Sequence, residues 1–233
     1  MNIRKCADIN EMGKKAGSMV ITELKHNPKL LVCPATGSSP VSLYASLANE
    51  ASKNMTLFQE MRVIPLDEWV GLPDATGSCD SFIKEHITTP LHVSKDRYFP
   101  FNTAAENLKE ECERMQYILK KQGPIDLCIL GLGQNGHLGF NEPANKTTPY
   151  CHIAQLATSS QQHDMVANSQ TKPTMGLTLG MQDILLSKRI ILLISGKGKK
   201  EAKEKLFSKE ISPKCPASFL WNHKSVECFL VDD

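Results

Sequence analysis

Four short apolar runs in the sequence each end in small or reactive residues. The runs are rich in Val, Ile and Leu and show no alternation of apolar and polar positions, which is typical of strands covered on both faces of a parallel sheet. They read KLLVCPATG, MRVIPLDEW, IDLCILGLG and RIILLISGKG. Because ligands bind outside the carboxyl ends of the strands in an open α/β sheet, we expect the residues that end these runs to meet at one site.

Helical patterns separate the runs. Between residues 103 and 122, apolar side chains recur at helical spacing, and Thr103 with Glu106 fits a capping box. Gly123 and Pro124 predict the end of this helix. Strands that alternate with helices predict a doubly wound, Rossmann-like α/β fold, in which three α/β/α layers surround a mostly parallel sheet. The run VECFLV predicts a last strand.

The composition and the absence of dividing segments indicate a single globular domain over residues 1–233. No repeat or low-complexity segment divides the chain. The net charge of +2 gives no reason to expect nucleic acid as a partner. No stretch approaches the ~18 apolar residues of a membrane span, and the N-terminus lacks the apolar core of a signal peptide, so we expect a cytoplasmic protein.

The eight cysteines form no C-x-x-C pair, and several lie in apolar runs, which favours reduced core side chains.

The stretch CILGLGQNGHLGFNEP, residues 128–143, contains the spacing G-x-G-x-x-G. A dinucleotide-binding turn needs a helix that starts near the third glycine and an acidic residue about twenty positions later. Pro143 would interrupt such a helix, and the sequence around Gln155 contains no Asp or Glu. We therefore expect a catalytic loop here and no nucleotide cofactor.

His137 and Glu142 lie close together in this loop, just past the end of a predicted strand. A histidine can move protons near neutral pH. A carboxylate that accepts one ring N–H selects the tautomer and stabilises the imidazolium. A histidine beside an Asn-Glu-Pro turn also fits a purely structural role, so the rest of the sequence has to decide between the two.

The segment GLGQNGHLGFNEP resembles the signature loop of the glucosamine-6-phosphate deaminase family, which is similar in fold to the 6-phosphogluconolactonases. The resemblance continues in PLDEWVGLP and ATGSSP and stays in register from Cys33 to Lys199. The segments LDEW, GSC, GLTLGMQDIL and PASFLW look most like the galactosamine-6-phosphate deaminase/isomerase branch. A lactonase would be expected to follow its Gly-His with a Ser-Leu-Phe-Pro type of sequence, so lactone hydrolysis is disfavoured.

The resemblance implies catalytic roles for several residues. Asp67 matches the general base that moves a proton between C2 and C1, and Glu68 is the competing choice. Adjacent strand residues point to opposite sides, so only one of the two should enter the site. His137 is expected to protonate the ring oxygen, with Glu142 orienting it. Asn135 stands where glucosamine-6-phosphate deaminases carry an aspartate; it can orient but carries no charge, and we interpret it as a mark of the substrate class.

Two segments are candidates for binding the substrate phosphate. Pro40 is a plausible first helical residue, and free amides at that helix start suit an anion or sugar hydroxyls, although the segment by itself fits an ordinary N-cap better. Lys199 matches the family's phosphate-binding lysine, whereas Lys197 and Lys200 match nothing. The predicted substrate-binding residues are Thr36, Gly37, Ser38, Ser39, Gly136 and Lys199.

The family's second phosphate ligand, an arginine on a mobile segment, has no counterpart in residues 157–175. His163 and Lys172 are the two candidates to replace it. The segment is polar and has few large apolar side chains, which suggests a lid that orders on binding.

These expectations combine into a cofactor-independent and metal-independent enzyme that converts galactosamine 6-phosphate to tagatose 6-phosphate and ammonia. The alternatives are a glucosamine-6-phosphate deaminase that yields fructose 6-phosphate, and a sugar-phosphate sensor without turnover. The expected partner is a small amino-sugar phosphate. Family members with longer C-terminal segments form hexamers, so we expect a monomer or small homo-oligomer for this chain.

Overall fold

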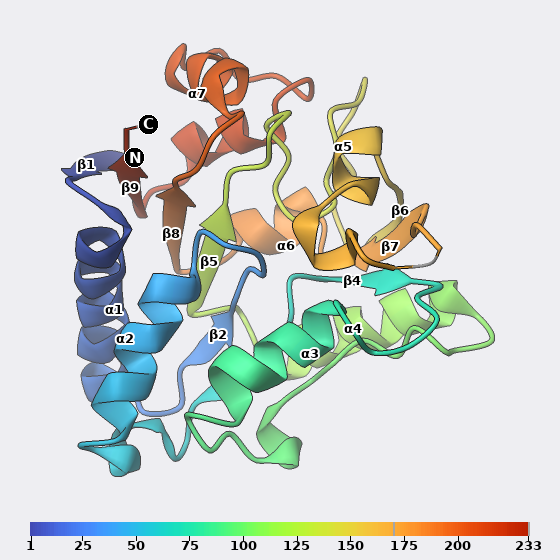
Figure 1. Ribbon diagram of the computed structural model, residues 1–233. Helices are drawn as coiled ribbons and strands as arrows, with labels where there is room; N and C mark the ends of the chain where they lie inside the picture. Colours follow the sequence, from blue (N-terminus) through green and yellow to red (C-terminus); the bar gives the residue numbers. More distant parts are fainter. Residues whose placement is uncertain (170, 233) are drawn as a thin grey trace.

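The central element of the computed structural model, which describes residues 1–169 and 171–232, is a parallel sheet of six strands (Figure 1). The strand order is β1-β9-β8-β5-β2-β3, and all neighbours run parallel. The strands are β1 (Asn2–Cys6), β2 (Leu31–Cys33), β3 (Arg62–Val63), β5 (Leu127–Gly131), β8 (Arg189–Ile194) and β9 (Val226–Val231). Each predicted apolar run contributes a strand, so the mostly parallel α/β sheet is confirmed, and VECFLV forms β9. Of the six strands of this sheet, β1 alone was not predicted.

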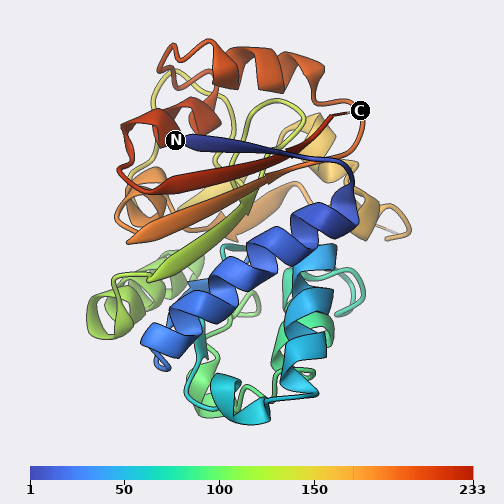
Figure 2. The same ribbon diagram turned by 90° about the vertical axis from the view of Figure 1, so that its left-hand side faces the viewer.

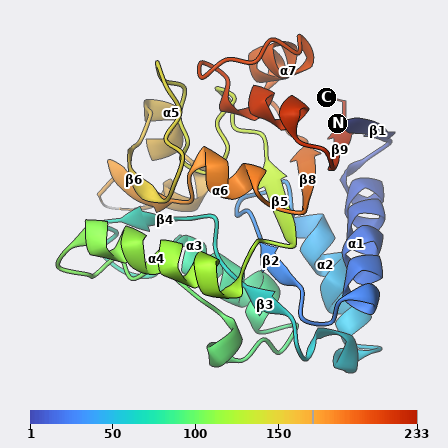
Figure 3. The same cartoon turned by 180° about the vertical axis from the view of Figure 1, so that it is seen from behind.

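Helices cover both faces of this sheet and complete the three layers. Helices α1 and α2 lie side by side on one face (Figures 1 and 2). Seen from behind, α4, α6 and α7 lie over the opposite face (Figure 3). The bounds are α1 (Ile9–His26), α2 (Val41–Ala51), α3 (Cys79–Ile83), α4 (Leu108–Gln122), α5 (Thr158–Gln161), α6 (Met181–Leu185) and α7 (Lys200–Phe207). The π-helical turn is η2 (Lys84–Thr88), and the 3-10 turns are η1 (Met55–Phe58), η3 (Lys95–Arg97), η4 (Asp164–Val166) and η5 (Pro216–Asn222).

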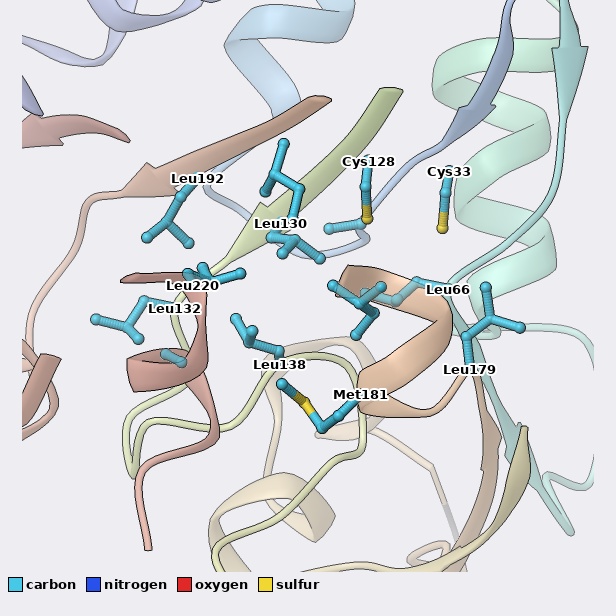
Figure 4. Close-up of a cluster of buried hydrophobic side chains, with 14 of the residues drawn as sticks. Cys33, Leu66, Cys128, Leu130, Leu132, Leu138, Leu179, Met181, Leu192 and Leu220 are labelled. Carbon is cyan, nitrogen blue, oxygen red and sulfur yellow. The ribbon is translucent and has the colours of Figure 1, made fainter. Parts of the chain in front are cut away.

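The strands explain why the apolar runs show no alternation. In β5, Leu127 and Ile129 pack with the side chains of α1 and α2, whereas Cys128 and Leu130 point to the other face. Figure 4 shows Cys128 and Leu130 in the apolar cluster on this other face, together with Met181 of α6. Both faces of each central strand are buried, so each of its positions needs an apolar side chain.

A second, antiparallel sheet of three strands lies beside the main sheet and corrects one prediction. It has the order β4-β7-β6, with β4 (Asp67–Val70), β6 (His152–Gln155) and β7 (Met175–Thr178). The run MRVIPLDEW was predicted as one strand, but only Arg62–Val63 pairs with β2, and Asp67–Val70 pairs with β7. Pro65 stands at the break, where it cannot donate to a strand ladder.

Helix starts were predicted less well than helix ends. Helix α4 begins at Leu108, where the side chain of Asn107 accepts a hydrogen bond from the backbone of Lys109. The Thr103–Glu106 capping box is therefore wrong, because Asn107 lies next to the helix and caps it as well as Thr does. The predicted end at Gly123 is confirmed. Pro40 takes the N-cap position of α2, one residue before the predicted place.

The eight cysteines are free thiols, and all except Cys151 are buried, as predicted from the apolar runs. In the described part of the chain, no helix combines the length and the apolar character that crossing a membrane requires. The same residues include no cluster of three or more His, Cys, Asp or Glu side chains arranged to hold a metal ion.

Candidate active site

A cavity of about 710 Å³ opens at the carboxyl ends of β2, β3, β5 and β8. Its wall includes residues from all four segments that follow the apolar runs, as expected for an open α/β sheet. Predicted site residues on this wall are Thr36, Gly37, Ser38, Ser39, Asp67, His137 and Lys199. Lys197, which matched nothing in the family, also lines the cavity. The structure thus brings together residues from four separate parts of the sequence.

Asp67 is the first residue of β4, and its carboxyl group is buried in the cavity wall. Burial raises the pKa of Asp67 to about 7, although a hydrogen bond from the thiol of Cys79 and the nearby His137 favour the ionised form. The Sγ atom of Cys79 lies 3.5 Å from Oδ1 of Asp67 and 3.5 Å from Oγ1 of Thr36. A carboxyl group with a pKa near 7 can both accept and return a proton at neutral pH.

Glu68 points away from the cavity. Its carboxylate accepts backbone hydrogen bonds from Trp69 at 2.8 Å, Cys79 at 2.9 Å and Asp80 at 2.6 Å. Two of these donors belong to the first turn of α3, so Glu68 anchors the start of that helix. The alternation of a strand therefore separates the two adjacent acids: Asp67 lines the cavity, and Glu68 holds the structure behind it.

His137 lines the cavity with a carboxylate and an amide behind it. Its Nδ1 lies 3.3 Å from Oε2 of Glu142. Asn135 donates to the same oxygen at 2.8 Å and accepts a hydrogen bond from the backbone N–H of His137 at 3.1 Å. Burial alone would raise the pKa of Glu142, but the hydrogen bond and charge of His137, together with Ser160 and Asn135, lower it to about 2. Glu142 is therefore a carboxylate at neutral pH, and Asn135 orients both partners.

Two further donors to Glu142 come from a segment that sequence reasoning did not connect to it. The hydroxyl of Ser160 and the backbone N–H of Ala157 both donate to Oε1 of Glu142. Ser160 is 2% exposed. No local pattern links these residues, because they follow Glu142 by 18 and 15 positions and reach it only through the fold.

Two glycines of the loop, Gly133 and Gly136, have different structural roles. A Cβ atom on Gly133 would lie 2.2 Å from Cδ2 of His137, so only a glycine leaves room for the ring. Gly136 has φ +90°, and a Cβ atom there would meet Sγ of Cys215 at 2.8 Å. Gly136 does not line the cavity, and its positive φ places it in a turn; its contact with substrate stays a prediction.

The part of the cavity wall formed by Ser39, Ser195 and Lys199 has the character of an anion site. Lys199 donates to the hydroxyl of Ser39 at 3.3 Å, and the hydroxyl of Ser195 donates to the same oxygen at 3.3 Å. Ser39 immediately precedes Pro40, the N-cap of α2. The positive end of the helix dipole, a lysine and two hydroxyl groups therefore converge on this part of the cavity wall.

The segment predicted as a lid, residues 157–175, contains α5 and η4 and ends at the start of β7; Gln170 lies outside the described residues. His163 lines the cavity. The ammonium group of Lys172 instead donates to the backbone carbonyls of Val166 at 2.7 Å and Ala167 at 2.6 Å. Of the two candidates for the missing arginine, only His163 faces the cavity.

Comparisons with known proteins find a family and relatives that match nearly the whole chain. Residues 9–229 match the family described as glucosamine-6-phosphate isomerases/6-phosphogluconolactonase. The chain is 34% identical to the putative deaminase AgaI of Escherichia coli (strain K12), with 98% of this chain and 91% of the relative covered. It is also 34% identical to the glucosamine-6-phosphate deaminase of Bacillus pumilus (strain SAFR-032), over 97% of this chain and 95% of the relative.

Solved structures give the same grouping. A monomeric glucosamine-6-phosphate deaminase superposes with a TM-score of 0.92 at 33% identity and covers 99% of this chain and 97% of its own. The 6-phosphogluconolactonase of Thermotoga maritima, at 19% identity and a TM-score of 0.79, covers 99% of both chains and shares the fold. From the family match and these relatives, the chain belongs to the glucosamine-6-phosphate isomerase/6-phosphogluconolactonase family.

Proposed function

We propose that the protein is an amino-sugar-phosphate deaminase that converts galactosamine 6-phosphate to tagatose 6-phosphate and ammonia. The observation that carries the proposal is the buried carboxyl group of Asp67, whose pKa is raised to about 7 and which shares a cavity with His137. An anion site with Lys199 and Ser39 lies in the same cavity. A general acid, a general base and a phosphate-binding site are what this reaction requires.

The first two steps of the proposed reaction have a residue to perform them. His137, oriented by Glu142 and Asn135, protonates the ring oxygen as the C1–O5 bond breaks, and the C1 hydroxyl loses its proton to form the aldehyde. Asp67 then removes the proton from C2 and returns it to C1, while a second proton passes from the amino nitrogen to O1; together these transfers convert the amino aldose to a ketose imine. Water adds to the imine carbon, and the C–N bond breaks to release ammonia and leave the ketose phosphate. Because no electrons are gained or lost overall, acid–base groups suffice for this sequence.

Deamination is favoured over lactone hydrolysis. The relatives with 30% or more identity described above carry the name deaminase, whereas the lactonase resembles this chain in fold. The carboxylate of Glu142 behind His137 belongs to the Phe-Asn-Glu-Pro sequence that separates this loop from the lactonase type.

The galacto configuration rests on the resemblance of LDEW, GSC, GLTLGMQDIL and PASFLW to the galactosamine branch and on Asn135 in the loop. Glucosamine 6-phosphate, which would yield fructose 6-phosphate, differs only in the direction of the C4 hydroxyl. A pocket discriminates such epimers by hydrogen bonds that only one of them satisfies.

The test is ammonia release from galactosamine 6-phosphate and glucosamine 6-phosphate measured side by side, with Asp67→Asn as the blank. A higher kcat/KM for the galacto epimer is expected. Preference for the gluco epimer would keep the reaction and change the substrate. Release from neither epimer, with binding retained, would favour a sugar-phosphate sensor.

We also propose a monomer or small homo-oligomer. The deaminase that superposes at a TM-score of 0.92 is described as monomeric. Sedimentation velocity over a range of protein concentrations measures the mass directly, and a hexamer would contradict this part of the proposal.

A further inference from the structure

We propose that His163 completes the phosphate site of this enzyme by donating a hydrogen bond from Nε2 to a phosphate oxygen, as a neutral imidazole. The inference deepens the proposed function and rests on it, because it names a ligand of the substrate's phosphate. It assigns the positive charge of the site to Lys199 and gives His163 the part of an uncharged donor.

The first support is the position of the ring. His163 lines the cavity together with Gly37, Ser39 and Lys199. A Cβ atom on Gly37 would lie 3.4 Å from both Cε1 and Nε2 of His163, so this edge of the ring faces the loop before α2. The ring is half-buried, and its centroid lies 6.2 Å from that of Trp69. Nε2 therefore lies beside the Gly37 loop, which leads to Ser39, the partner of Lys199.

The second support is the tautomer. Nδ1 of His163 accepts a hydrogen bond from the backbone N–H of Met165 at 3.2 Å. A backbone N–H can only donate, so Nδ1 carries no hydrogen, and the single proton of the neutral ring is on Nε2. The turn η4 thus directs a donor, and not a lone pair, at the Gly37 loop.

The third support is the charge around the ring. Burial lowers the pKa of His163; Asp164 opposes this effect, whereas His137 and Lys199 add to it. Protonation of Nδ1 would in addition break the hydrogen bond from Met165. The ring therefore stays neutral at neutral pH and binds an anion through its N–H, which a phosphate accepts without any change of protonation.

The segment that carries His163 is held in place on both sides. The backbone N–H of His163 donates to the carbonyl of Ser160 at 3.1 Å, and the N–H of Val166 donates to the carbonyl of His163 at 2.9 Å. Val166 is fully buried in a small apolar cluster with Trp69. These contacts position the imidazole at the cavity wall.

The test measures binding of two unreactive probes, inorganic phosphate and sorbitol 6-phosphate, by isothermal titration calorimetry at pH 7.5. The variants are His163→Ala and His163→Gln. The control is His152→Ala, which removes another half-buried histidine, one that contacts the carbonyl of Tyr150 and lies outside the main cavity. Circular dichroism spectra confirm that each variant is folded.

We expect His163→Ala to weaken both probes about tenfold or more, as is typical of a lost hydrogen bond to a charged group. His163→Gln keeps an N–H donor and should stay within about threefold of the parent protein, as should the control. An unchanged affinity in His163→Ala would overturn the proposal. A loss for sorbitol 6-phosphate alone would also overturn it, because the ring would then contact the sugar.

Protonation is tested separately by ¹⁵N NMR of the phosphate complex. We expect the chemical shifts of a neutral ring with hydrogen on Nε2, and a doubly protonated ring would contradict the neutral donor. None of these measurements depends on turnover. Failure of ammonia release would therefore reject the deaminase while leaving the phosphate result standing, and the reverse holds as well.

Discussion

The hydroxyl of Ser160 donates a hydrogen bond to Oε1 of Glu142, while the other carboxylate oxygen of Glu142 faces Nδ1 of His137. Helix α5 is thereby joined to the pair that we propose opens the sugar ring. The same short segment carries His163, three residues further on, whose ring lines the cavity beside Gly37. A phosphate that contacts His163 would therefore stabilise the segment that orients Glu142.

We predict that Ser160→Ala lowers kcat about tenfold with little change in KM, because Glu142 loses a charge-assisted hydrogen bond that holds it against His137. Ser160→Thr keeps the hydroxyl and serves as the matched control. The ¹H chemical shift of the Nδ1 proton of His137 should move in the alanine variant and stay near the parent value in the threonine variant. Parental kcat in Ser160→Ala would show that the contact is not needed for turnover.

Asp67→Asn should abolish exchange of solvent deuterium into C1 and C2 of the substrate. The amide has the size of the carboxylate but cannot accept the C2 proton, and loss of a general base costs about 10²- to 10⁴-fold in rate. Mass spectrometry of recovered substrate and product measures the exchange. If exchange continued at the parent rate, Asp67 would lose its role as base.

The activity should rise with pH through about 7. Asp67 acts as a base only when ionised, and burial raises its pKa to about 7. Below that pH the protonated fraction grows, so kcat/KM should fall about tenfold per pH unit. The pH profile of kcat/KM between pH 5 and 9 checks this prediction. An acid limb near pH 4, the ordinary range of an aspartate, would mean that the group is not desolvated in the free enzyme.

Gly133→Ala should displace the ring of His137 and reduce kcat by about two orders of magnitude, because the new Cβ would lie 2.2 Å from Cδ2 of the ring. Gly131→Ala is the control for folding, since nothing lies within 4 Å of a Cβ atom there. Melting temperatures and the NMR signals of His137 separate the two effects. An unmoved His137 ring in Gly133→Ala would contradict the close packing.

Local patterns predicted the parts of the fold that depend on neighbours along the chain. The apolar runs, which show no alternation of apolar and polar positions, predicted strands buried on both faces. The residues that end these runs predicted where the cavity lies. The pleat of a strand predicted that Asp67 and Glu68 would separate, as they do. The family resemblance added the roles of these residues, which no spacing or periodicity contains.

Local patterns gave wrong predictions of the cap of α4 and of the strand around Pro65. Asn107 caps α4 in place of Thr103, since both residue types offer a side-chain acceptor and only the helix position distinguishes them. The run around Pro65 has the apolar composition of one strand, yet the chain leaves the parallel sheet there and pairs with β7 in a second sheet.

The layered parallel sheet and the positions of the site segments along the chain follow from local patterns in the sequence. The neighbours of each side chain depend on how the elements pack: Cys79 against Asp67, Ser160 against Glu142 and His163 over Gly37. Each of these pairs joins segments that are adjacent only after the sheet and helices have packed. Burial and hydrogen bonding, which control the pKa of Asp67 and the tautomer of His163, are properties of that packing and are absent from any local pattern.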